Sequence, residues 1–268
     1  MVPWDREEAL ELAGAVGVPG IYFANWLANA ATDDDDSEVL VLAAKERLAG
    51  VCFFGARGNL VVLEREHLAA EAVADAVVKS GWGWRIALAR QAVVRALAAR
   101  EATPPLVERE QIWYGVVPAC VDPARVRSDV RSATKADLSA LIDCALQLNH
   151  SDLHVEPWRV NKIWLSGMLL RRIHEDTTRI VDSRGQVASK LDLGSKGPHG
   201  LVLEGVFTVA AARGRGLATG LVATVACEAG DGVPMVCLHV ATTNAAARKA
   251  YERAGMREVA RCGILLRG

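Results

Sequence analysis

The run Arg213-Gly214-Arg215-Gly216-Leu217-Ala218 decides the fold that this chain is expected to adopt. It lies between an apolar, strand-like stretch at 201–209 and an alanine-rich, helix-like stretch at 217–229. A strand, a glycine-bearing turn and a helix N-terminus together present unpaired backbone N–H groups and a positive helix end to one spot. That arrangement suits a pyrophosphate group. Because short glycine-arginine turns also serve as plain connectors, the run needs support from the residues that follow it.

The residues after the first helix-like stretch supply this support. Residues 235–240 are apolar and typical of a buried strand, and a second helix-like stretch follows them. Asn244 suits the N-cap of that helix, and Gly255 suits the position just past its end. The sequence therefore predicts a helix, a strand and a second helix after the glycine turn.

With these elements in place, the second half of the chain resembles the GNAT family of acetyl-CoA-dependent N-acetyltransferases. The family pattern Arg/Gln-x-x-Gly-x-Gly/Ala corresponds to Arg213, Gly216 and Ala218. The later family pattern, Asn-x-x-Ala-x-x-x-Tyr-x-x-x-Gly, corresponds to Asn244, Ala247, Tyr251 and Gly255. Two motifs in the expected order and at the expected separation make the resemblance specific over residues 127–268.

The composition is that of an ordinary globular protein. The chain has 268 residues, of which 51% are hydrophobic and 24% are charged, so it can form one large or two small domains. Its start lacks the basic and apolar regions of a signal peptide, and no stretch reaches the ~18 apolar residues of a membrane span. We expect a cytoplasmic protein with no membrane partner.

The charge is divided unevenly between the two halves. Residues 1–125 carry a net charge of −6 and residues 126–268 a net charge of +5. The basic half contains the glycine turn, which fits a polyanionic cofactor such as coenzyme A. No dense basic patch with interleaved aromatic residues is present, so no nucleic-acid partner is expected.

No metal site is expected either. The six cysteines show no C-x-x-C spacing and are interpreted as reduced thiols. The acidic run 33–36 lacks the alternating spacing of a calcium loop, and the run 149–156, with two histidines and two acids, is predicted to be a loop without helical registration. In the family, this loop and the start of the next helix, Trp158 and Arg159, usually shape the acceptor pocket.

The order of elements agrees with the resemblance. In the second half, a strand at 127–133 and a capping-box-like start at Thr134 lead into a helix to about residue 148. The remaining predicted elements are a helix at 158–173, strands at 178–183, 186–193 and 201–209, the helix after the turn, a strand at 235–242, the Tyr251 helix and a strand at 257–266. This β-α-α-β-β-β-α-β-α-β order is the one that the resemblance implies.

The first half repeats part of that order. After a helix at 7–16, the predicted elements are strands at 38–44, 50–55 and 59–64, a helix at 67–79, a strand at 84–89, a helix at 91–100 and a strand at 111–117. The fold class is therefore α/β (α+β), with tandem GNAT-like folds and a mixed, mostly antiparallel sheet flanked by helices. Residues 1–122 are expected to form a degenerate copy without the glycine turn, and residues 123–268 the catalytic domain.

The resemblance implies where the cofactor lies. Two strands splay apart, the pantetheine arm runs along the first of them, and the pyrophosphate rests on the glycine turn. The residues expected to contact acetyl-CoA are Val206, Phe207, Thr208, Arg213, Gly214, Arg215, Gly216, Leu217, Ala218, Thr219 and Asn244. Ala210 stands where the family usually has a proline, which leaves the entry geometry open.

Three residues are candidates for the proton transfers. Tyr251 matches the family's general acid, although a tyrosine on a helix is also common in a core. His239 could relay a proton from an ammonium group, and it could equally be a hydrogen-bonded core residue. Glu204 is the alternative base; pairing with a cation on the next strand, such as Lys190, is the structural alternative.

The function expected from the sequence is direct acetyl transfer to an amine in a ternary complex. The acceptor is an amine on a small molecule or a peptide, and a homodimer is kept open. A catalytically silent protein that senses acyl-CoA or docks a partner is the alternative. A nucleotide-binding enzyme is disfavoured because the acidic ribose-binding residue and the Gly-Lys-Ser/Thr of a P-loop are lacking.

Overall fold

The computed structural model describes residues 6–29, 37–44, 47–56, 58–65, 68–183 and 185–268. The chain divides into two compact units. The first unit comprises Met1–Trp113, Lys196–His199 and Val259–Gly268, and the second comprises Tyr114–Ser195 and Gly200–Glu258. The closing segment of the chain therefore groups with the first unit.

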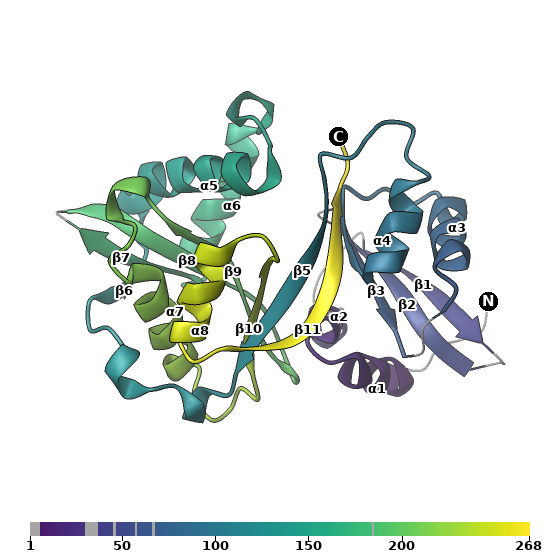
Figure 1. The fold of residues 1–268 in the computed structure, drawn as a ribbon, viewed down its shortest axis with the longest axis horizontal. Helices are drawn as coiled ribbons and strands as arrows, with labels where there is room; N and C mark the ends of the chain where they lie inside the picture. Colours follow the sequence, from purple (N-terminus) through teal and green to yellow (C-terminus); the bar gives the residue numbers. More distant parts are fainter. Residues whose placement is uncertain (1–5, 30–36, 45–46, 57, 66–67, 184) are drawn as a thin grey trace. The chain divides into compact units, whose positions relative to one another are not determined.

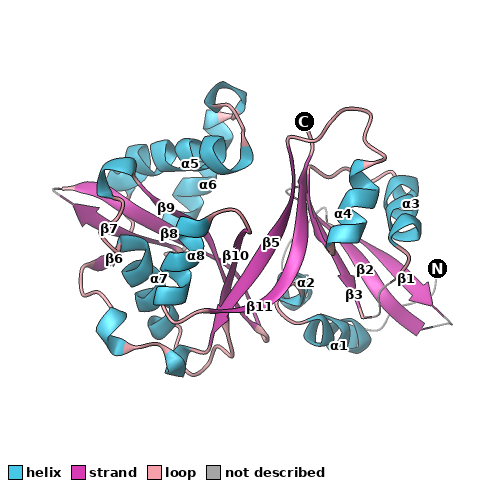
Figure 2. Cartoon of the chain, viewed as in Figure 1, coloured by secondary structure: helices cyan, strands magenta, loops and turns pink. Residues whose placement is uncertain are grey.

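The first unit contains a sheet with helices on both faces (Figures 1 and 2). Its helices are α1 (Arg6–Val16), α2 (Gly20–Asn29), α3 (Ala70–Ser80) and α4 (Gln91–Ala98). Its strands are β1 (Glu38–Ala44), β2 (Arg47–Gly55), β3 (Asn59–Glu64), β4 (Ile86–Ala89), β5 (Val107–Val116) and β11 (Arg257–Leu266), in the order β1-β2-β3-β4-β11-β5. The last residues of β5 and the first residues of β11 belong to the second unit.

Alternation along the strands fills both faces of this sheet. Cys52 and Phe54 of β2 pack in the core that contains α3 and α4. Val51 and Phe53, one residue earlier in each case, pack in the core that contains α1 and α2. Successive side chains of a strand point to opposite faces, so a strand between two helical layers is apolar throughout.

The second unit contains the glycine turn. Its elements are β6 (Val130–Ser132), α5 (Leu138–Leu153), α6 (Lys162–His174), β7 (Thr178–Ser183), β8 (Gln186–Gly197), β9 (Gly200–Thr208), α7 (Leu217–Glu228), β10 (Val236–Ala241) and α8 (Ala245–Arg253). The strand order is β5-β10-β9-β8-β7-β6. Helices α5 and α6 pack together on one side of β7–β9, and α7 and α8 pack together on the other (Figure 1).

The element order confirms the fold class expected from the sequence. The pairs β1–β2, β2–β3, β4–β11, β6–β7 and β7–β8 are antiparallel, whereas β3–β4 and β9–β10 are parallel. The sheet is therefore mixed and mostly antiparallel, with helices on its faces. Within the described residues, none of the helices has the length and apolar character needed to cross a membrane.

Several boundaries differ from the prediction. Helix α2 was not predicted, and α5 continues to Leu153, so the predicted loop at 149–157 is helical in its first part. Helix α5 ends at His154, whose φ is 54°. Helix α6 begins only after Asn161, whose side-chain oxygen accepts a hydrogen bond from the Trp164 N–H at 3.0 Å. The acidic run 33–36 lies outside the described residues.

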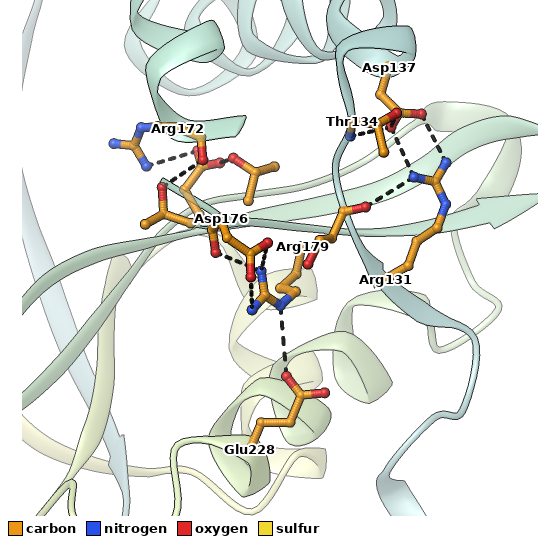
Figure 3. A network of polar contacts seen from close by, with 11 residues as sticks. Arg131, Thr134, Asp137, Arg172, Asp176, Arg179 and Glu228 are labelled. Carbon is orange, nitrogen blue, oxygen red and sulfur yellow. Dashed lines mark hydrogen bonds and ion pairs between the residues drawn. The ribbon is translucent and has the colours of Figure 1, made fainter. Parts of the chain in front are cut away.

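A polar network fixes the start of α5 on the sheet (Figure 3). The Arg131 guanidinium donates to both carboxylate oxygens of Asp137 at 2.9 Å and also contacts Asp182 at 2.8 Å. Asp137 in turn accepts from the Thr134 N–H at 2.7 Å, which completes the capping box that the sequence predicted. The Arg131 hydrogen bonds hold the pKa of Asp137 well below its usual range.

Candidate functional site

The glycine turn between β9 and α7 contains two residues in the left-handed backbone conformation. Gly214 and Gly216 have φ values of 76° and 74°, a left-handed conformation that a side chain disfavours. No neighbouring atom lies within 4 Å of a Cβ built at either residue, so the backbone conformation, and not packing, requires glycine there. Gly216 is the N-cap of α7, and no side chain caps this helix. The first-turn N–H groups of α7 therefore face an exposed turn.

Two arginine side chains border this turn. The Arg213 Nε donates to the Thr208 carbonyl at 3.1 Å, and its guanidinium lies 5.8 Å from the centre of the Phe207 ring. The Arg215 Nη1 donates to the Ser183 hydroxyl at 3.1 Å. Both side chains are exposed. They add positive charge beside the N-terminus of α7, where an anion is already favoured.

The two strands beside the turn pair over only a short register. β9 and β10 are parallel, with Leu201 opposite Val236 and Val202 opposite Cys237. The rest of each strand runs on beyond these pairs. Continuing the same register brings Glu204 level with His239. Glu204 of β9 and His239 of β10, the two candidate bases, therefore both come after the two residue pairs that these strands share.

The last residues of β9, 205–208, lead to the glycine turn. Gly205 has a φ of 57°, which interrupts the alternation of the strand. Val206 is half-buried, and the Phe207 side chain packs in the core between the sheet and helices α5 and α6. The Phe207 carbonyl accepts a hydrogen bond from the Ser189 hydroxyl at 3.1 Å, and the same hydroxyl lies 2.9 Å from that of Thr208.

Other residues expected to contact the cofactor use their side chains to hold the helices. Leu217 is buried and Ala218 is half-buried. The Thr219 hydroxyl donates to the Ala250 carbonyl at 3.1 Å and so joins α7 to α8. The Asn244 side-chain oxygen accepts from the Ala247 N–H at 3.1 Å, which makes Asn244 the N-cap of α8, as predicted.

Tyr251 lies on α8 with 6% of its surface exposed. Its ring packs against that of Tyr114, with 6.1 Å between the ring centres. Burial, and to a smaller extent the negative charge of Asp152 in the last turn of α5, raises the pKa of Tyr251 above its usual range. The phenol is therefore held in its protonated form.

Tyr114 is a neighbour that the sequence analysis did not single out. Its hydroxyl donates to Glu252 Oε1 at 2.8 Å and accepts from Arg248 Nε at 3.3 Å. Burial raises the pKa of Tyr114 as well. A tyrosine in an apolar strand is a common core residue, so no local pattern marked Tyr114 as a partner of Tyr251.

Glu204 has a partner other than the one considered from the sequence. Its Oε2 accepts a hydrogen bond from Arg172 Nη2 of α6 at 3.0 Å. Lys190 instead pairs with Asp192, two residues along β8. The spacing of Arg172 after Leu165 and Leu169, which are buried on α6, is the signal that places it on the sheet-facing side of the helix.

His239 and the run 149–156 are the remaining predicted features. His239 is half-buried on β10. His150 Nδ1 lies 3.5 Å from Glu156 Oε1. Within the described residues, no group of three or more histidines, cysteines and acids is arranged to hold a metal ion.

The comparisons with known proteins agree with this geometry. The sequence model of the acetyltransferase (GNAT) family matches residues 150–256, which include β9, the glycine turn and Tyr251. Among curated proteins, none matches the chain.

Solved structures with a similar fold cover nearly the whole chain. A protein from Drosophila is 13% identical with a TM-score of 0.67, over 98% of this chain and 97% of that one. A GCN5-related N-acetyltransferase from Kribbella flavida is 14% identical with a TM-score of 0.56, over 94% and 96%. Another from Sphaerobacter thermophilus is 15% identical with a TM-score of 0.53, over 96% and 94%.

At these identities the structural likeness concerns the fold alone, and the family model locates the domain. The matched segment holds the left-handed glycines, the short β9–β10 register and the buried tyrosine. Over residues 150–256 the chain is therefore similar to the acetyltransferase (GNAT) family.

Proposed function

We propose that this protein transfers an acetyl group from acetyl-CoA directly to an amine acceptor in a ternary complex. The observation that supports this most strongly is the exposed N-terminus of α7 behind Gly214 and Gly216, next to two strands that share only a short register. The turn offers backbone N–H groups to a pyrophosphate, and the open strand edges offer peptide groups to pantetheine.

The cofactor would be held mainly by the backbone. Residues 214–219 supply the N–H groups of the turn and of the first turn of α7, and Arg213 and Arg215 supply charge. Val206, Phe207 and Thr208 border the course of the pantetheine arm. An N–H donor fixed beside the thioester carbonyl can lower the barrier by about 3 kcal/mol, because it stabilises the oxyanion of the tetrahedral intermediate.

The transfer requires three proton movements: the acceptor nitrogen loses one proton before it attacks and a second after the carbon–nitrogen bond has formed, and the departing thiolate gains one. The amine nitrogen attacks the thioester carbon, a carbon–nitrogen bond forms, and the carbon–sulfur bond breaks. Tyr251 is proposed to give its phenolic proton to the departing thiolate. The proton that the acceptor ammonium must lose before attack goes to water, to His239 of β10 or to Glu204 of β9. The second nitrogen proton passes to water or restores the phenol of Tyr251 after that phenol has given up its own proton.

The experiment is a comparison of binding and turnover. Acetyl-CoA is titrated into the purified protein by calorimetry, and the release of free thiol is followed with a panel of alkyl and aryl amines. The proposal expects both binding and amine-dependent thiol release. Binding without turnover would instead support a silent acyl-CoA-binding protein, and absence of binding would contradict both.

A further inference from the structure

Four charged side chains form a network next to residues 203–208 of β9, the part of the strand after its two pairs with β10, here called the open segment of β9. Arg172 Nη2 donates to Glu204 Oε2 at 3.0 Å, and Arg172 Nη1 lies 3.3 Å from Asp192 Oδ2. Asp192 also pairs with Lys190 and accepts from the Thr178 hydroxyl at 2.8 Å. Two cations and two anions therefore share one site on the α6 side of the sheet.

Burial decreases along this network toward Glu204. The side chains of Lys190 and Asp192 are 3% and 7% exposed, that of Arg172 is 17% exposed, and that of Glu204 is 32% exposed. The Lys190–Asp192 pair is the most buried part of the network, and Asp192 also accepts a hydrogen bond from the Thr178 hydroxyl. The network is therefore anchored in the core, and Glu204 is its member with the most access to solvent.

Gly194 of β8 and Gly205 of β9 lie so close to this network that neither position has room for a side chain. A Cβ on Gly205 would lie 2.7 Å from Asp192 Oδ2 and 2.9 Å from Lys190 Nζ. A Cβ on Gly194 would lie 2.6 Å from the Glu204 carboxyl carbon. The left-handed Gly205 follows Glu204 directly and faces the same ion pair. The direction of the Glu204 side chain is thus set by β8, β9 and α6 together.

We infer that Arg172 is a positioning residue that holds the Glu204 carboxylate at the open segment of β9, where this carboxylate binds the acceptor amine as an ammonium ion. The inference rests on the proposed function. A partly exposed carboxylate beside the proposed course of pantetheine attracts a cationic amine and orients it by a charge-assisted hydrogen bond. The substrate class is therefore an alkyl amine that is protonated at neutral pH, rather than an uncharged aryl amine.

A double-mutant cycle tests whether Arg172 acts through Glu204. The variants are Arg172→Met, Glu204→Gln and the double variant, and kcat/KM is measured for an alkyl amine and for an aryl amine from the panel. Each single substitution is expected to lower kcat/KM for the alkyl amine about tenfold, the size of one charge-assisted hydrogen bond, and to lower it less for the aryl amine, which brings no ammonium ion to the Glu204 carboxylate. The double variant is expected to be no worse than Glu204→Gln alone.

Two further variants separate positioning from a structural effect. Arg171→Met removes the exposed neighbouring arginine. It is expected to leave unchanged the kcat/KM values for the alkyl amine and the aryl amine and the KM for acetyl-CoA. Arg172→Lys keeps the cation and is expected to recover part of the loss, and it serves in place of Arg172→Met if that variant does not fold.

The outcomes are distinguishable. Three results would overturn the role of Arg172 without affecting the proposal of acetyl transfer. They are additive losses of kcat/KM in the double-mutant cycle, equal losses for the two amines, and the same loss in Arg171→Met. Binding of acetyl-CoA with no transfer to any amine would overturn the proposed function, and this inference with it.

Discussion

Tyr251 owes its proposed role to its surroundings. Its ring is buried against Tyr114, and burial raises the pKa of its phenol. A phenol that stays protonated can donate to a thiolate formed beside it, and the newly formed tyrosinate would be reprotonated readily.

We predict that Tyr251→Phe lowers kcat about 100-fold, because it removes the proton donor and keeps the ring. The KM for acetyl-CoA is expected to change little, and steady-state thiol release measures both. Tyr114→Phe is the matched control, since it removes a buried hydroxyl from the adjoining ring and should retain most of kcat. An unchanged kcat in Tyr251→Phe would remove Tyr251 from the mechanism.

Gly216 permits a second prediction about a single residue. Gly216→Ala places a Cβ in open space at a φ of 74°, so its cost is that of the left-handed conformation, about 1 kcal/mol. The turn is expected to relax away from its anion-binding shape, and the affinity for acetyl-CoA should fall about tenfold in calorimetry. Gly232→Ala, also in open space but without a positive φ, is the control and should bind normally. Equal affinities for the two variants would contradict a backbone cradle.

At the scale of elements, the start of α5 depends on charge. Arg131 of β6 joins the capping aspartate of α5 to Asp182 of β7 (Figure 3). The Asp137 side chain is largely buried, and its pKa in the folded state is below its usual range. This lowering contributes stability above the unfolded pKa of about 4, and the contribution is lost as the pH falls below that value toward the folded pKa.

We predict that Arg131→Met lowers the free energy of unfolding by about 1 kcal/mol at pH 7. The difference from the unsubstituted protein should shrink as the pH falls below about 4, because Asp137 then binds a proton in the unfolded chain and in folded Arg131→Met before it does so in the folded unsubstituted protein. Urea denaturation at several pH values measures this. Arg125→Met, in which an exposed pair with Asp122 is lost, is expected to show almost no difference at any pH. A loss in Arg131→Met that did not depend on pH would point to packing instead.

Local signals explain which elements and site residues could be predicted. Thr134 and Asn244 are caps whose side chains bond within three residues, so their sequence patterns carry their structure. Helix α2 was not predicted because its residues are apolar with almost no polar face, and such a run has no clear helical period. For Glu204 the sequence suggested, as one alternative, pairing with a cation on the next strand such as Lys190. The cation that pairs with it is instead Arg172 of α6, and Lys190 pairs with Asp192 within β8. A contact between elements so far apart in the chain leaves no local pattern.

At the scale of the whole molecule, the last strand completes the first unit. β11 lies between β4 and β5, and Leu265 pairs with Ala87 of β4. Ile264 and Leu265 are almost fully buried. The sequence assigned this strand to the second half, since pairing between residues so far apart in the chain leaves no local pattern.

We predict that the fragment 123–268, made alone, is poorly soluble or unfolded, although it contains the proposed catalytic residues. Its closing strand would expose Ile264 and Leu265 and an unpaired strand edge. Size-exclusion chromatography and circular dichroism of the fragment measure this, and coexpression with 1–122 is expected to restore solubility. A monomeric, folded fragment 123–268 would show that β11 is dispensable for that half.

The place of β11 also has a consequence for biosynthesis. Because β11 lies between β4 and β5 but follows both of them by more than a hundred residues in the chain, these two strands leave the ribosome before the strand that pairs between them. The sheet of the first unit can be completed only after Arg257–Leu266 has left the ribosome. Until then, the facing edges of β4 and β5 lack the strand between them, and a chaperone that binds exposed strand edges would have a defined binding site there.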